Sequence, residues 1–136
     1  MQVNPYLSFD GRADEAIAFY QRALGAEVKM LMRFKDYPGP ADPGMVRPGT
    51  ENNVMHANLS IGESTILLSD GRCTGKPQFQ GVSLAITVAD VAEAERVFAA
   101  LAEGGQVQMP LAKTFFSPSF GMVADRFGVA WMVYVA

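Results

Sequence analysis

The same order of apolar patterns occurs twice along this chain, and the repeat restricts the possible folds more than any other feature. In the first copy, alternating apolar residues near 6–10 precede apolar residues at helical spacing over 13–24. In the second copy, an alternating pattern over 82–88 precedes a helical pattern over 91–101. Each copy therefore predicts a strand followed by an amphipathic helix.

Both copies continue into three more segments that we interpret as strands, of which the last, 129–135, is rich in β-branched and aromatic residues. These segments are 27–34, 54–61 and 65–69 in the first copy, and 106–114, 120–124 and 129–135 in the second. The pattern is βαβββ, twice, which makes the fold class α+β. One such module has too little core by itself, so we expect the two to form one curved mixed sheet around a cavity. A ferredoxin-like α+β sandwich is the alternative.

At 136 residues the chain has the length of one domain. We expect module one at about 1–70, a connector at 71–81 and module two at 82–136. The loop 36–53 contains four Pro and three Gly, which favours either a lid over the cavity or an excursion without function.

Charge and composition indicate which classes of binding partner and which cellular compartment to expect. The net charge is −3, and no block of Lys and Arg suggests nucleic acid binding. The N-terminus lacks the pattern of a signal peptide, and no apolar run reaches the roughly 18 residues of a membrane span. The single cysteine is typical of a reducing compartment. We therefore expect a soluble, cytoplasmic protein that binds neither nucleic acid nor membranes.

The opening segment NPYLSFDGRADEAIAFYQRALGAE and the closing segment KTFFSPSFGMVADRFGVAWMVYV carry a resemblance to a known family. They resemble the PhnB-like branch of the vicinal oxygen chelate superfamily, which includes glyoxalases, bleomycin-resistance proteins and extradiol dioxygenases. PhnB-like proteins are often labelled 3-demethylubiquinone-9 3-methyltransferase-like. The resemblance implies the two-module fold with its cavity, and also a homodimer. No glycine-rich loop between a strand and a helix is present for dinucleotides or S-adenosylmethionine.

Metal-using members of this superfamily carry ligands on the cavity face of four strands. Strand alternation places Tyr6 and Ser83 at two of these positions here, and counting from the turn glycines Gly62 and Gly128 places Leu67 and Met132 at the other two. Phenol, hydroxyl, aliphatic and thioether groups are poor ligands for divalent metals. We therefore predict no metal and no cofactor, and this disfavours glyoxalase and extradiol chemistry, which depend on a metal. Tyr6, Ser83 and Met132 are retained as candidate ligand-binding residues.

A polar row offers the main alternative for chemistry. Within 54–61, His56, Asn58 and Ser60 alternate with apolar residues and share one face of the strand. His56, the single histidine, is the candidate catalytic residue, as a general base or a hydrogen-bond donor, and Asn58 and Ser60 are candidate ligand contacts. A purely structural His56 is the competing interpretation.

Two weaker candidates complete the predicted ligand-binding set. Asp70 could orient a ligand, although an Asp before Gly is usually a turn residue. Phe116 could form an aromatic wall, although aromatic residues in strands are usually core.

We therefore predict a metal-independent protein that binds a small-molecule ligand. The alternatives are an enzyme that uses His56 for proton transfer, or a metalloenzyme with displaced ligands such as His56 and Asp70.

Overall fold

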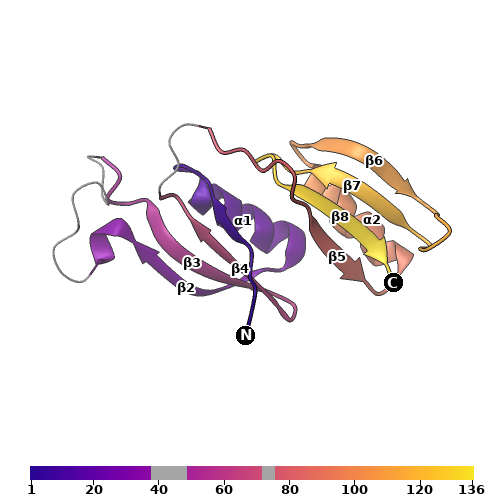
Figure 1. Cartoon of the computed structure of the whole chain (residues 1–136), viewed down its shortest axis with the longest axis horizontal. Coiled ribbons are helices and arrows are strands. Elements are labelled where there is room, and N and C mark those ends of the chain that lie inside the picture. Colours follow the sequence, from indigo (N-terminus) through magenta and orange to yellow (C-terminus); the bar gives the residue numbers. More distant parts are fainter. Residues whose placement is uncertain (38–48, 72–75) are drawn as a thin grey trace. The chain divides into compact units, whose positions relative to one another are not determined.

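Each of two units in the computed structural model has one helix packed against one face of a four-stranded sheet (Figure 1). The units are Met1–Pro77 and Gln78–Ala136. The structure describes residues 1–37, 49–71 and 76–136. Most of the loop 36–53 and part of the connector 71–81 thus lie outside the described residues, and so does the predicted lid.

The first unit contains β1 (Tyr6–Ser8), α1 (Ala13–Leu24), β2 (Glu27–Arg33), the 3-10 helix η1 (Phe34–Asp36), β3 (Val54–Ile61) and β4 (Ser64–Ser69). Its sheet order is β1-β4-β3-β2, in which β1 and β4 are parallel and the other pairs are antiparallel. The last strand of the module therefore lies between the first and third strands. In this order β1 and β2 are the edge strands, and β4 and β3 form the middle of the sheet.

Helix α1 buries one face against this sheet. Its apolar side chains at helical spacing, among them Ala16, Phe19, Tyr20 and Ala23, are almost fully buried. They share the core with Phe9, Ala57, Leu59 and Leu68. The helix ends at Gly25, which adopts the left-handed conformation (φ 67°) and donates its N–H to the Gln21 carbonyl at 3.1 Å.

The second unit repeats this arrangement with β5 (Leu84–Val88), α2 (Val91–Ala102), β6 (Gln106–Ala112), β7 (Phe120–Ala124) and β8 (Ala130–Val135). The sheet order is β5-β8-β7-β6, and again only the first and last strands of the module are parallel. Asp90 caps the N-terminus of α2, and its carboxylate accepts the Glu93 N–H at 2.8 Å. Its buried face packs on Val123, Trp131 and Val133 in the core.

The predicted βαβββ repeat is confirmed, with one mixed four-stranded sheet in each unit. The joining of both sheets around a cavity stays a prediction, and so does the assignment of the whole chain to one domain. Among the described residues, no helix has the length and apolar character needed to span a membrane.

Several predicted strand ends differ from the observed ones by one or two residues. Strand β2 ends at Arg33 because Phe34 begins a 3-10 turn, in which the Asp36 carboxylate accepts the Arg33 N–H at 3.0 Å. Strand β6 ends at Ala112 because Thr114 N–H donates to the Ser117 carbonyl at 2.9 Å and closes a turn. Strand β5 begins at Leu84, two residues later than expected.

Candidate functional site

The face of the first sheet opposite α1, called here the open face, gathers most of the polar candidates. Ala57, Leu59 and Leu68 point toward α1 and are fully buried. The alternate side chains lie on the open face and are exposed or half-buried. The open face comprises Tyr6 from β1, Met30 and Met32 from β2, His56, Asn58 and Ser60 from β3, and Leu67 from β4.

The register aligns one row of these residues across all four strands. Tyr6 lies opposite Leu67, Leu67 opposite Asn58, and Asn58 opposite Met30. His56 lies opposite Met32 on the neighbouring row. Paired residues on one face lie close enough for their side chains to touch, so these residues form a continuous surface.

Tyr6 and His56 form a hydrogen-bonded pair on this surface. The phenol oxygen of Tyr6 lies 3.0 Å from His56 Nδ1, and the ring centroids are 5.6 Å apart. Tyr6 is 51% exposed. When the phenol donates to Nδ1, the imidazole carries its proton on Nε2 and presents a donor. Nε2 has no hydrogen-bond partner among the residues that the structure describes.

The other two polar candidates of the open face, Asn58 and Ser60, differ in whether their side chains already form hydrogen bonds. The Asn58 amide has no hydrogen-bond partner within the described part of the chain, so its donors and acceptor can serve a ligand. The Ser60 hydroxyl donates to the Gly62 carbonyl at 3.3 Å. Met30 is 42% exposed and, with Met32, gives β2 an apolar border. The open face thus presents a polar strand flanked by apolar side chains.

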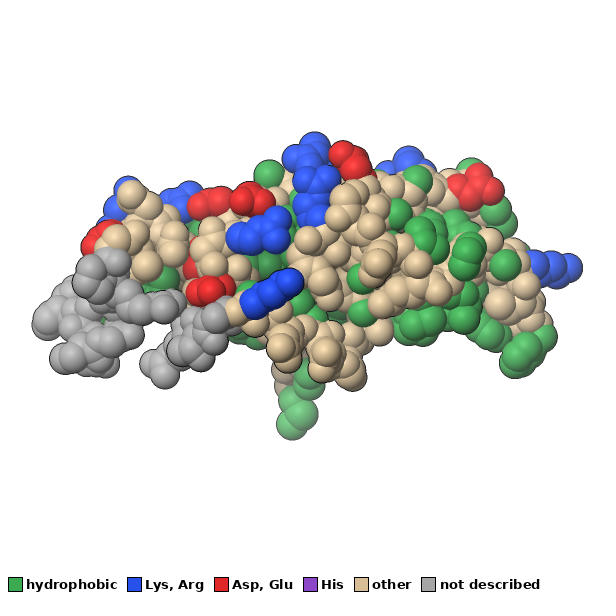
Figure 2. Space-filling view, turned by 90° about the horizontal axis from the view of Figure 1, so that it is seen from above, with side chains coloured by type: hydrophobic (Ala, Val, Ile, Leu, Met, Phe, Trp, Pro, Cys, Tyr) green, Lys and Arg blue, Asp and Glu red, His purple; other side chains and the backbone are tan. Residues whose placement is uncertain are grey.

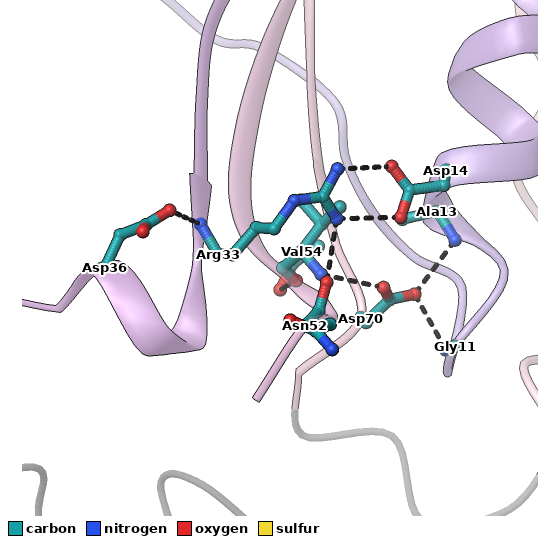
Figure 3. Close-up of polar contacts among 9 residues, drawn as sticks. Gly11, Ala13, Asp14, Arg33, Asp36, Asn52, Val54 and Asp70 are labelled. Carbon is teal, nitrogen blue, oxygen red and sulfur yellow. Dashed lines mark hydrogen bonds and ion pairs between the residues drawn. The ribbon is translucent and has the colours of Figure 1, made fainter. Parts of the chain in front are cut away.

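Asp70 lies off this surface, in the core at the end of β4. Its Oδ1 accepts the N–H groups of Gly11 and Ala13 at 2.7 and 2.9 Å, and its Oδ2 accepts the Val54 N–H at 3.0 Å (Figure 3). The side chain is 4% exposed. Asp70 therefore connects the start of α1 to the start of β3. From the sequence, the structural alternative considered for Asp70 was only that of a turn residue.

A second contact borders this corner in Figure 3. Arg33 donates to both carboxylate oxygens of Asp14, at 2.8 and 3.0 Å, and to the Asn52 carbonyl at 2.7 Å. The hydrogen bonds with Asp14 raise the pKa of Arg33 above its usual value. Arg33 thus joins α1 to the end of β2.

The second unit carries Ser83, Phe116 and Met132. Ser83 is exposed just before β5, and Met132 lies on the face of β8 opposite α2, paired with Ala85 and Met122. Phe116, 55% exposed, makes edge-to-face contacts with Phe115 and Phe120 at centroid distances of 5.2 and 5.1 Å. Hydrophobic side chains gather on the surface of this unit (Figure 2).

The structure therefore brings together Tyr6, His56, Asn58 and Ser60 in the first unit. In the second unit, Ser83 precedes β5, Phe116 lies in the loop before β7, and Met132 lies on β8. Among residues 1–37, 49–71 and 76–136, no three His, Cys, Asp or Glu side chains are grouped so that they could hold a metal ion.

Comparisons with known proteins support one family. The family model described as 3-demethylubiquinone-9 3-methyltransferase matches residues 1–134. The protein YjdN of Escherichia coli is 39% identical over 142 residues, which cover 99% of this chain and 95% of YjdN.

Solved structures agree with this match. Protein PA1353 from Pseudomonas aeruginosa shares 43% identity with a TM-score of 0.84, covering 99% of this chain and 97% of that protein. The PhnB protein from Bacillus cereus shares 30% identity with a TM-score of 0.81, covering 100% of both chains. At 14% identity and a TM-score of 0.67, a glyoxylase/bleomycin resistance protein/dioxygenase domain from Frankia is similar in fold, with 100% and 97% coverage.

Proposed function

Because the chain belongs to the 3-demethylubiquinone-9 3-methyltransferase-like (PhnB) family and has the glyoxalase/bleomycin resistance fold, we propose that it binds a small molecule on the open face of the first sheet. Binding in this proposal needs no metal. The observation that carries it is the Tyr6–His56 pair, in which an exposed phenol orients the single imidazole of the chain. Neither group is needed to satisfy buried backbone.

The contrast with Asp70 supports this assignment. Asp70 is buried, and its carboxylate accepts three backbone N–H groups. The side chains of Tyr6 and His56 contact each other on the surface. This contact restricts their conformational freedom, which costs free energy, although the fold does not depend on it. Asn58 adds an amide without a partner among the described residues. Ligand binding gives these groups a use.

Proton transfer at His56 is the second candidate function. Tyr6 bonded to Nδ1 would fix the imidazole so that Nε2 meets the substrate, and a positioned imidazole is the commonest general acid or base. Only turnover of a substrate distinguishes this enzyme from a binding protein.

A metalloenzyme with His56 and Asp70 as displaced ligands is disfavoured. Both carboxylate oxygens of Asp70 accept backbone N–H groups, so coordination would leave buried donors without partners. Methyl transfer is not part of the proposal, since the sequence has no glycine-rich loop for S-adenosylmethionine.

A screen of small molecules by thermal unfolding tests the proposal, because a ligand that binds only the folded state raises Tm. For compounds that stabilise the wild type, we expect His56→Ala to reduce or abolish the rise in Tm. Loss of one hydrogen bond costs about 1 kcal/mol, which weakens binding about fivefold. Tyr6→Phe should weaken binding less, because it removes the orienting bond and keeps the ring.

Gln21→Ala, on the exposed side of α1, is the matched control and should keep the full rise in Tm. If the compounds raise Tm equally in His56→Ala and in the wild type, the proposal is contradicted.

A further inference from the structure

The open face also restricts the chemistry of its ligand, given that the proposed function holds. Along β3, His56 and Asn58 are alternate residues on one face. Alternate residues of a strand are about 7 Å apart. Their free polar atoms can therefore meet two polar atoms at opposite ends of one small molecule.

Apolar side chains border this polar pair on both sides. Met30 and Met32 lie opposite Asn58 and His56 on β2, and Leu67 lies opposite Asn58 on β4. The flexible thioether side chains of Met adapt to the shape of an apolar ligand. The surface of a sheet is broad and shallow, so it fits a flat body better than a round one.

The charged side chains at both ends of β2 already have partners. Glu27, which lies opposite Ser60, accepts from Lys29 at 2.9 Å, and this hydrogen bond lowers the pKa of Glu27. Arg33 is paired with Asp14 on both of its carboxylate oxygens. Lys29 and Arg33, the two cations of β2, are therefore each paired with a carboxylate rather than left for an anionic ligand.

We infer that the open face takes an uncharged, flat molecule with an apolar ring body and a polar group at each end. His56 Nε2 binds one polar group, and the Asn58 amide binds the other. The methionines of β2 and Leu67 cover the ring edges.

Three naphthalenes test this class near neutral pH. They are 2,6-dihydroxynaphthalene, with two polar ends, 2-naphthol, with one, and 2,6-naphthalenedicarboxylate, with two charged ends. By isothermal titration we expect 2,6-dihydroxynaphthalene to bind most tightly. Each lost hydrogen bond should weaken binding about fivefold, so 2-naphthol should bind about fivefold more weakly. The dicarboxylate should bind more weakly still, because it loses hydration without gaining a cation.

Variants locate the two ends. His56→Ala and Asn58→Ala should each weaken 2,6-dihydroxynaphthalene about fivefold, toward the affinity of 2-naphthol. Gln21→Ala, on the exposed side of α1, is the matched control and should leave the affinity unchanged. A loss of affinity in Ser60→Ala, at the next position of the open face, equal to that in Asn58→Ala would overturn the assigned spacing.

The outcomes separate this inference from the proposed function. Tightest binding of the dicarboxylate, sensitive to His56→Ala, would overturn the uncharged class and keep the site. If the three probes bind with the same affinity to His56→Ala as to the wild type, the proposed site itself is contradicted. Failure of all three probes to bind would overturn the inferred class, while the thermal screen would still decide the proposed function.

Discussion

Two polar residues predicted for the same site have opposite surroundings. His56 lies on the open face with one ring nitrogen bonded to Tyr6. Asp70 lies in the core and accepts three backbone N–H groups. An exposed polar group can be replaced without leaving partners unpaired, whereas a buried acceptor cannot. We therefore expect substitutions of His56 to affect ligand binding and those of Asp70 to affect stability.

Asp70→Asn tests the structural role. The amide nitrogen replaces one acceptor by a donor that faces backbone N–H groups, so we expect the free energy of unfolding to fall by about 3 kcal/mol. Urea unfolding followed by circular dichroism measures this.

The matched control is Asp90→Asn at the N-cap of α2, where the side chain accepts a single N–H. Asn caps helices about as well as Asp, so its effect should stay below about 0.5 kcal/mol. Equal effects of both substitutions would contradict the role assigned to Asp70.

The Tyr6–His56 contact could not be predicted from the sequence. Alternation within 54–61 correctly put His56 on the face away from the apolar side chains, since that needs only the period of a strand. The contact with Tyr6 depends on the sheet order, in which β4 separates β1 from β3. Strand order is a property of tertiary packing, and local patterns do not encode it.

At the scale of elements, the helices and the strands β3 and β7 were predicted with the observed bounds at nearly every end. By contrast, the sequence did not correctly predict which positions of β4 and β8 are equivalent in the two modules. The hairpin of β3 and β4 turns through Gly62 and Glu63, whereas that of β7 and β8 turns through residues 125–129.

Counting from the turn glycines therefore misaligns the last strands. A shift of 77 residues along the sequence aligns Leu7 with Leu84. Leu7 lies opposite Leu68, whereas Leu84 lies opposite Trp131. Leu67 thus corresponds to Ala130, and Met132 corresponds to Ser69. The longer turn is held by Asp125, which accepts from Phe127 and Val129 N–H groups and from the Trp131 indole at 2.8 Å.

Gly105, between α2 and β6, tests how tightly this turn packs. A Cβ at Gly105 would clash with the Ala124 carbonyl oxygen and with the Asp125 backbone at 2.9 Å. Backbone cannot move aside as a side chain can, so Gly105→Ala should lower the free energy of unfolding by about 2 kcal/mol or more, measured by urea unfolding.

Gly71→Ala provides the comparison within the first unit. A Cβ there would meet the Phe34 ring and the Ser69 hydroxyl at 3.2 Å, and both side chains can shift. We expect a smaller loss than for Gly105→Ala. A larger loss would contradict the packing described around β7.

At the scale of the whole molecule, the two modules share strand order and helix position but differ in the chemistry of the sheet face away from the helix. The first carries Tyr6, His56 and Asn58, whereas the second carries Phe120, Met122 and Met132. The repeat itself was readable from sequence because each module carries the same apolar periods. The homodimer implied by the resemblance stays a prediction.

The most direct test of the central claim is the NMR spectrum of the His56 imidazole, which is unambiguous because the chain has one histidine. With 15N-labelled histidine, we expect Tyr6→Phe to shift the Nδ1 resonance and any compound that raises Tm to shift the Nε2 resonance. Ring-nitrogen shifts that stay unchanged in Tyr6→Phe and at saturation with stabilising compounds would contradict the claim that this face binds the ligand.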